Sequence, residues 1–366
     1  MNILYISNLK GTKYSGPHTS VPAQIKAQSK YDNVYWFNIN ESINEDYWGG
    51  ELEFHNSASN PLLKIDKFPP PFNKPDLVIF QGLYYIQYCN IGKELKKYKI
   101  PYIIIPRGAL TKAAQKNKKL KKSTANSLFF NKFIKNALAI HYLTEQELID
   151  SSEKWNNRNF VMPNGHIVKK LIRNNSFADN YLKGVFIGRP DVYQKGLDLF
   201  LNALGDLKER LLESNCLIEI YGPEILSGKE KIQKLIQINN LEEIVVQKGP
   251  VYDEEKENVL LNSDYFILTS RFEGHPMGLI EALGYGLPCF VTSGSNMSNE
   301  IFEENAGWTA DISVESIKEN FAKLLDEKEK MNEKGGNAVK LAKKYDWNII
   351  AQKSRLVYLS LLEEVS

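Results

Sequence analysis

The sequence predicts two doubly wound α/β domains, because short apolar runs alternate with segments of helical length in both halves of the chain. At 366 residues, the chain exceeds the size at which one hydrophobic core usually keeps growing. Its 43% of hydrophobic residues is an ordinary content for a soluble globular protein. The polar stretch 169–180 is the best candidate for a linker between a first domain, 1–168, and a second domain, 181–345.

Ten short apolar runs are the predicted strands. Those of the first half are Ile3–Ile6, Val34–Phe37, Leu77–Phe80, Tyr102–Pro106 and Ala139–Leu143. Those of the second half are Val185–Gly188, Leu217–Tyr221, Ile244–Gln247, Tyr265–Thr269 and Cys289–Thr292. A closing helix is predicted from about Trp347 to Leu362, within a terminal segment 346–366.

Charge and composition argue against several classes of protein. The net charge of +2 is too small for a broad nucleic-acid-binding surface. No segment approaches the roughly 18 apolar residues of a membrane-spanning helix, and Ile3–Ile6 reads as a first strand rather than part of a signal peptide. The cysteines are scattered, which indicates buried thiols in a reducing compartment; they are Cys89, Cys216 and Cys289. A cytoplasmic location is therefore predicted.

The most informative feature of the chain is the pair Glu273 and Glu281. The run Tyr265–Thr269 before them reads as a buried parallel strand, and the segment from about Met277 to Tyr285 reads as the helix after it. Glu273 is thus expected on the strand-to-helix loop and Glu281 about one turn inside the helix. Ligands of open α/β sheets bind there, at the carboxyl ends of strands and beside helix N-termini that favour anions.

The run Ser270–Pro288 resembles the signature of the retaining, nucleotide-sugar-dependent glycosyltransferases of family 4, whose two glutamates are separated by seven residues. The resemblance includes the Gly-x-Pro-x-Gly between the acids and the Gly-Leu-Pro after them. It implies the GT-B fold, with two Rossmann-like domains facing a cleft and a C-terminal helix that crosses back to the first domain. In that fold the donor binds mainly to the second domain and the acceptor mainly to the first.

The same resemblance implies roles for the residues of the motif. Glu273 would bind donor-sugar hydroxyls and steady positive charge at the anomeric carbon. Glu281 would accept hydrogen bonds from the ribose hydroxyls, as an acid does in other nucleotide sites. The remaining residues expected at the donor are His275, Met277, Gly278 and Leu279.

A second site is predicted after the strand Val185–Gly188, where a loop carries Arg189 and Lys195 ahead of a segment with helical spacing. Arg189 offers a planar fork suited to a diphosphate, and Lys195 offers a mobile point charge. The segment resembles the donor-diphosphate site of family 4, about 80 residues before the glutamate motif. Arg189 and Lys195 therefore join Glu273 as the expected catalytic residues.

The resemblance also implies a mechanism that retains the anomeric configuration and needs no metal. The favoured account is a front-face attack, in which the leaving phosphate helps to deprotonate the acceptor hydroxyl. A double displacement would instead require a carboxylate nucleophile on the opposite face of the sugar. Arg189, Lys195 and helix-terminal amides would meet the charge of the departing nucleoside diphosphate. The sequence contains no Asp-x-Asp, and its five histidines lack the i, i+4 spacing of a zinc helix.

The first domain is less informative. A glycine-containing loop after the first strand ends near Gly16 and resembles the family's first glycine loop, which approaches the donor phosphate; an ordinary turn is the alternative. Arg107 follows the strand Tyr102–Pro106, where many family members carry a histidine that contacts the donor sugar. Two interpretations of Arg107 stay open: binding of an anionic part of donor or acceptor, and a purely structural role.

The segment from Leu95 to Thr144 contains twelve lysines and arginines and no acidic residue. A solvated helix face is one interpretation of its densest part, Lys112–Lys122, which is followed by the aromatic residues Phe129, Phe130 and Phe133. An anionic membrane with a polyprenyl-diphosphate-linked acceptor is another. RNA binding is a weaker third interpretation, because no stacking motif accompanies the charges.

The sequence therefore predicts a glycosyltransferase of bacterial surface polysaccharide synthesis, cytoplasmic or peripheral at the inner face of the plasma membrane. It would use a nucleotide-diphosphate sugar, UDP-linked in preference to GDP-linked, and a glycan or lipid-linked acceptor. Two alternatives are a nucleotide-sugar 2-epimerase of the same fold and a non-catalytic partner subunit. Such a subunit would be expected to lose donor-site acids or cations, and all four are present here.

Overall fold

The computed structural model describes residues 1–10, 16–40, 55–56, 59–116, 119–151, 155, 158–167, 181–224 and 227–365. These residues form two compact units. Unit 1 comprises Met1–Gly165 together with Trp347–Ser366, and unit 2 comprises His166–Asp346. The predicted linker 169–180 lies outside the described residues.

Unit 1 is built on a parallel sheet with the strand order β3-β2-β1-β4-β5-β6-β7. Both faces of the sheet are covered: Ile3 and Tyr5 of β1 pack into one buried cluster, and Leu4 and Ile6 pack into another. Burial on both faces explains why these strands are continuous apolar runs. The strands are β1 Asn2–Ser7, β2 Asn33–Asn38, β3 His55–Asn56, β4 Leu77–Gln81, β5 Tyr102–Ile105, β6 Ala139–Tyr142 and β7 Asn159–Val161. The helices are α1 Gly16–Gln28, η2 Ile65–Lys67, α2 Ile86–Lys97, α3 Lys112–Lys116, α4 Lys119–Ala125, η3 Asn126–Phe130, α5 Asn131–Lys135, α6 Glu145–Asp150 and α15 Trp347–Glu363.

Unit 2 contains a second parallel sheet, with the strand order β10-β9-β8-β11-β12-β13. The order reverses direction between β8 and β11, and ligands of such sheets bind at the carboxyl ends of the strands beside this point. The strands are β8 Leu182–Ile187, β9 Cys216–Tyr221, β10 Val245–Lys248, β11 Tyr265–Leu268, β12 Cys289–Thr292 and β13 Gly307–Ala310. The helices are α7 Leu197–Gly205, α8 Lys208–Glu213, α9 Gly228–Ile238, α10 Asp253–Leu261, α11 Met277–Gly284, η4 Ser293–Ser295, α12 Ser298–Glu303, α13 Val314–Asp326, η5 Lys328–Lys330 and α14 Met331–Lys343.

All ten predicted strands are present, with ends that differ by at most a few residues. The sequence did not predict the strands β3, β7 and β13. The first has two residues, the second has three, and the third begins at Gly307, a residue type that is depleted in strands. Short edge strands of this kind carry too few apolar residues to stand out as a run.

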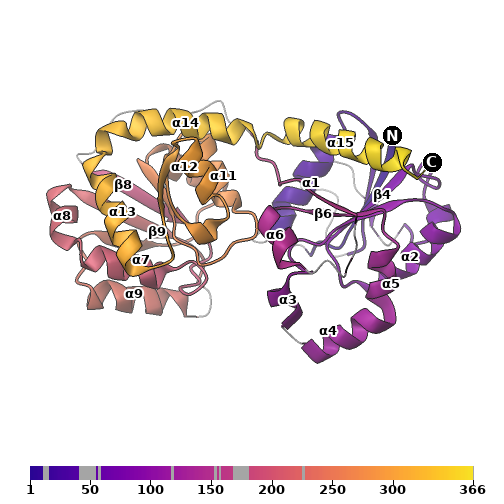
Figure 1. Cartoon of the computed structure of the whole chain (residues 1–366), viewed down its shortest axis with the longest axis horizontal. Helices are drawn as coiled ribbons and strands as arrows, with labels where there is room; N and C mark the ends of the chain where they lie inside the picture. Colours follow the sequence, from indigo (N-terminus) through magenta and orange to yellow (C-terminus); the bar gives the residue numbers. More distant parts are fainter. Residues whose placement is uncertain are drawn as a thin grey trace. The chain divides into compact units, whose positions relative to one another are not determined.

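The C-terminal helix α15 packs on unit 1, which confirms the predicted return to the first domain. Figure 1 shows α15 alongside α1, and the two helices are in contact. Tyr358 is fully buried in the cluster that contains Ile3 and Tyr5. Trp347, the first residue of α15, packs against Gly165. A Cβ on Gly165 would lie 2.4 Å from the Trp347 indole, so the indole fills the space that a side chain at Gly165 would need. Arg355 donates to Asp32 Oδ1 at 3.1 Å.

Two further sequence predictions concern the whole chain. Within the described residues, no helix is long and apolar enough to cross a membrane. The three cysteines are free and buried, as expected.

Candidate active site

The loop between β8 and α7 is held against the end of β11 by a glycine. Gly196 precedes α7 with a left-handed φ of +62°, and a Cβ on it would lie 2.0 Å from the carbonyl oxygen of Thr269. The neighbouring Lys195 amide donates to Asp191 O at 2.8 Å. Only glycine permits both this conformation and this close approach. The backbone of Lys195 is thereby placed at the carboxyl ends of β8 and β11.

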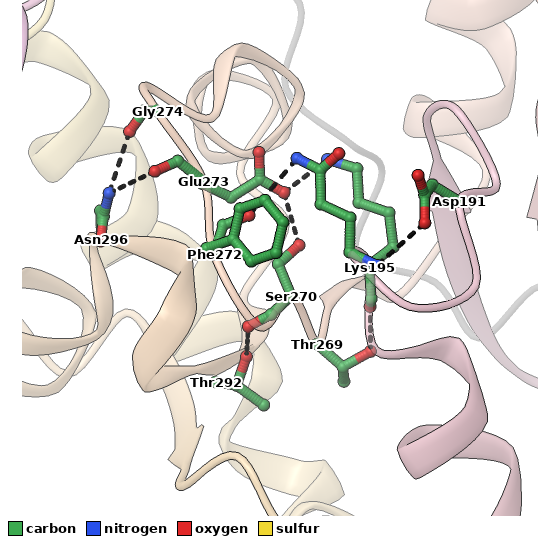
Figure 2. A network of polar contacts seen from close by, with 10 residues as sticks. Asp191, Lys195, Thr269, Ser270, Phe272, Glu273, Gly274, Thr292 and Asn296 are labelled. Atoms are coloured by element: carbon green, nitrogen blue, oxygen red, sulfur yellow. Dashed lines mark hydrogen bonds and ion pairs between the residues drawn. The ribbon is translucent and has the colours of Figure 1, made fainter. Parts of the chain in front are cut away.

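Lys195 and Glu273, which lie 78 residues apart in the sequence, meet at this edge of the sheet (Figure 2). The Lys195 ammonium forms an ion pair with Glu273 Oε1, and the two side chains are only 13% and 9% exposed. Ser270 donates its hydroxyl to the same carboxylate oxygen. The Ser270 carbonyl in turn accepts a hydrogen bond of 2.7 Å from the hydroxyl of Thr292. The carboxylate that the sequence singled out is therefore buried, and two donors fix its position.

The backbone on both sides of this ion pair is fixed by side chains that the sequence did not predict. Asn296 donates its amide to the carbonyl oxygens of Glu273 at 2.6 Å and Gly274 at 3.2 Å (Figure 2). Asn296 itself has a left-handed φ of +60°, a conformation that asparagine tolerates. Thr269 donates its hydroxyl to Lys195 O at 3.1 Å. Asn296 lies in no pattern that would have marked it, and Thr269 was predicted only as the end of a strand.

Arg271, inside the glutamate motif, ties the same two loops together. Its guanidinium forms a two-pronged pair with Asp198 of α7, at 2.6 and 2.7 Å. It also donates to Tyr193 O at 2.7 Å and lies over the Tyr193 ring, 4.5 Å from the centroid. The hydrogen bonds that Arg271 donates to Asp198 raise the pKa of Arg271. Arg271 is thus a structural cation that holds the loop of Lys195.

Glu281 lies inside α11, as predicted, and is paired with Lys256 of α10. Both side chains are about one quarter exposed, at 26% and 24%. The start of α11 closely approaches the end of β8, because a Cβ on Gly278 would lie 3.5 Å from Ile187 O. Lys256 was not predicted, since nothing in its own helix marks it as a partner of the motif.

The other predicted residues of α11 and the loop before it differ in accessibility. Leu279 is 1% exposed within the hydrophobic core, and its amide donates to Pro276 O at 3.0 Å. His275 is half-buried, with its ring centroid 5.8 Å from that of Tyr345. Met277 begins the helix, and its amide donates to His275 O. The donor role expected of these residues stays a prediction.

Arg189 follows β8 as predicted but lies outside the Lys195–Glu273 contact. Its side chain is exposed, and its guanidinium makes no hydrogen bond or ion pair with any residue that the structure describes. The loop around it packs tightly on two glycines. A Cβ on Gly222 would lie 2.2 Å from Gly188 O, and one on Gly228 would lie 2.6 Å from Pro190 O. The loop backbone is therefore held while the Arg189 side chain is available to a ligand.

In unit 1, Gly16 is the first residue of α1, and most of the loop before it, 11–15, lies outside the described residues. No described atom lies within 4 Å of a Cβ built on Gly16. The Gly16 carbonyl accepts a hydrogen bond of 2.9 Å from Ser20. Nothing in the described part of unit 1 requires glycine at this position, and the predicted approach to a donor phosphate stays a prediction.

Arg107 is anchored by the side chains of β4 and α1. It donates to Gln81 Oε1 from Nε at 3.0 Å and from Nη2 at 2.9 Å, and to Ser20 Oγ at 3.0 Å. Burial lowers its pKa to about 10. Its φ of +51° is left-handed, and the next residue, Gly108, donates its amide to the Glu147 carboxylate. These bonds favour the structural interpretation of Arg107, and its contact with an anion stays a prediction.

The basic segment forms helices α3, α4, η3 and α5 of unit 1. Lys112, Lys116, Lys119 and Lys121 are exposed, whereas Lys118 lies outside the described residues. Within the part of the chain that the structure describes, no group of three or more histidine, cysteine, aspartate or glutamate side chains is placed to hold a metal ion.

The chain is similar to several known proteins. Residues 168–341 match the family model described as Glycosyl transferases group 1. An uncharacterized glycosyltransferase from Methanocaldococcus jannaschii is 26% identical over 282 residues, which cover 74% of this chain and 72% of that protein. The putative colanic acid biosynthesis glycosyltransferase WcaL of Escherichia coli is 28% identical over 121 residues, 31% of this chain and 29% of that protein. Among solved structures, Anabaena HepE in complex with UDP and glucose has a TM-score of 0.69 at 14% identity, over 98% of this chain and all of that one.

Proposed function

We propose that this chain, whose residues 168–341 match the group 1 glycosyltransferase family, is a GT-B glycosyltransferase that transfers a hexose from a nucleotide-diphosphate sugar with retention of configuration. The acceptor would be a glycan or a lipid-linked sugar of bacterial surface polysaccharide synthesis. The observation that carries the proposal is the Lys195–Glu273 ion pair, at the carboxyl ends of β8 and β11. The donor diphosphate and the donor sugar would bind at this edge of the sheet.

In the proposed reaction, the protein mainly positions groups and stabilises charge. Lys195, with Arg189 from the same loop, would bind the diphosphate and offset the charge that develops on the leaving group. Glu273, already oriented by Ser270, would accept hydrogen bonds from sugar hydroxyls and stabilise positive charge at the anomeric carbon. Glu281 would bind the ribose hydroxyls. The leaving phosphate would take the proton of the attacking hydroxyl.

We further propose that this chemistry needs no metal ion. Two cations from the β8–α7 loop and the first-turn amides of α11 would provide positive potential at the diphosphate. The amide of Gly278 lies in the first turn of that helix, where no intrahelical acceptor exists. Such preorganised donors do the electrostatic work that a divalent cation does in other transferases.

A UDP-sugar is the proposed donor, since the related fold of HepE has been solved with UDP and glucose. The role in surface polysaccharide synthesis is supported by the name of WcaL, which describes a colanic acid biosynthesis enzyme. The exposed lysines of Lys112–Lys122 support a peripheral position on an anionic membrane, where each contributes on the order of 1 kcal/mol. Co-sedimentation with anionic but not neutral vesicles, lost at about 1 M salt, would test this position.

Thermal unfolding with UDP, GDP or ADP tests the donor site directly. A nucleotide present at 100 times its dissociation constant should stabilise the protein by about 2.7 kcal/mol. We expect the largest shift with UDP and a much smaller one in Lys195→Ala. The absence of any shift, with all three nucleotides at millimolar concentration, would contradict the proposal.

A further inference from the structure

Helices α3, α4, η3 and α5 of unit 1 line an open cavity of about 420 Å³. Figure 1 shows α3 and α4 projecting from the sheet of this unit. Three lysines from three of these helices line the cavity: Lys116, Lys119 and Lys135. Its other lining residues are hydroxyl and amide side chains with one tryptophan, and no carboxylate is among them. The cavity is therefore positively charged.

The three lysine charges are not neutralised by the protein. None of the three ammonium groups forms a hydrogen bond or ion pair with a described residue. The neighbouring Lys122 differs, because it donates to Ala114 O at 2.6 Å and lies 5.2 Å from the centre of the Tyr84 ring. Three like charges around one cavity repel one another, and a bound anion would remove that repulsion.

The wall of the cavity is shaped by a π-helix, η3. This wider turn is rare and occurs frequently at functional sites. Asn126, at its start, is 8% exposed and donates its amide to Gln115 Oε1 at 3.1 Å. Its own oxygen is buried and has no hydrogen-bond partner among the described residues. A buried acceptor of this kind needs a donor, such as a hydroxyl group.

We propose that this cavity binds the diphosphate of a lipid-linked acceptor, with the first sugar hydroxyl near Asn126. The inference rests on the proposed function, which supplies an acceptor that carries a lipid diphosphate. The three lysines can offset both negative charges of a diphosphate that links a lipid to a sugar. The volume lies within the range of about 300–1,000 Å³ that is usual for small-molecule sites. The same helices expose apolar side chains for the lipid: Leu120, Leu128 and Phe129 are 86%, 66% and 43% exposed.

A pair of matched triple variants tests this site. Lys116→Ala/Lys119→Ala/Lys135→Ala removes the lining charges. Lys112→Ala/Lys121→Ala/Lys132→Ala removes the same number of exposed charges from the same three helices, but none of these residues lines the cavity. Calorimetry with farnesyl diphosphate, inorganic pyrophosphate and farnesol, all in saturating UDP, measures binding while the donor site is occupied. Circular dichroism and thermal unfolding of both variants verify the fold.

We expect the lining triple to bind farnesyl diphosphate at least about tenfold more weakly than the unaltered protein, and the control triple to change by less than about threefold. Pyrophosphate should bind the unaltered protein and farnesol should not, because the phosphates are recognised first. Equal losses in the two triples would show attraction by bulk charge and overturn the proposal, as would no diphosphate binding to the unaltered protein. Because binding is measured without transfer, a failure of the proposed function would appear separately, as absent turnover with intact diphosphate binding.

Discussion

Gly196→Ala should damage both stability and donor binding, because Gly196 sets the position of Lys195. The added Cβ would lie 2.0 Å from Thr269 O, well inside van der Waals contact. Because Thr269 O is a backbone atom, it cannot move aside as easily as the end of a flexible side chain. Alanine with a φ of +62° costs about 1–2 kcal/mol by itself. Because the loop must also be displaced, we expect the free energy of unfolding to fall by about 2–4 kcal/mol.

Urea unfolding and UDP titration measure the two effects. The loop must move away from β11 to relieve the contact, which separates the Lys195 ammonium from Glu273 and should weaken UDP binding by roughly tenfold or more. Gly336→Ala is the control, since a Cβ there meets no atom within 4 Å and the residue lies inside α14. It should stabilise by about 0.5–1 kcal/mol. A Gly196→Ala protein with unchanged stability and UDP affinity would refute the geometry proposed for this loop.

The remaining predictions concern single side chains and the dependence on metal. Glu281→Gln should mainly weaken binding of UDP. Glu273→Gln should leave UDP binding near normal and depress turnover. Equal losses of UDP affinity in titrations of the two variants would show that the roles are wrongly assigned. Lys195→Ala should lower kcat/KM by an amount equivalent to about 2–4 kcal/mol of transition-state stabilisation. Turnover of the unaltered enzyme should survive strong chelation. Loss of turnover with EDTA that manganese restores would contradict metal independence. Burial lowers the pKa of His141 to about 4 in the folded protein, compared with about 6.5 in the unfolded chain. The neutral side chain therefore contributes its full stabilisation above about pH 6.5, and this contribution is lost as the pH falls toward 4. Between pH 7 and pH 5 the unaltered protein should lose about 2 kcal/mol more stability than His141→Gln in urea unfolding, and equal losses would count against this.

The fold was predictable because parallel strands covered on both faces are continuous apolar runs. In β11 and β12, burial is complete or nearly complete for Ile267, Leu268, Phe290 and Val291. Such burial requires apolar residues at successive positions, which are visible in the sequence as a run. The edge strand β13 does not form an apolar run of this kind, because it has only four residues and begins with Gly307. The meeting of Lys195 and Glu273 also followed from topology, since both residues come after neighbouring parallel strands.

The side chains that fix the site were not predictable in the same way. Asn296 reaches the Glu273 carbonyl only because its own backbone is left-handed, and Lys256 reaches Glu281 from a different helix. Such contacts depend on loop conformations that have no period in the sequence. Arg107 illustrates the same limit, since its bonds to Gln81 and Ser20 join three segments that are far apart in the chain.

The central claim is retaining transfer from a nucleotide sugar at the Lys195–Glu273 site. Proton NMR of the first sugar released from UDP-α-glucose, or from whichever α-linked nucleotide sugar the protein turns over, tests it most directly. We predict that the α-anomer appears first, before mutarotation, and that Glu273→Gln strongly slows its formation without abolishing UDP binding. A product that appears first as the β-anomer, or turnover that is undiminished in Glu273→Gln, would contradict the claim.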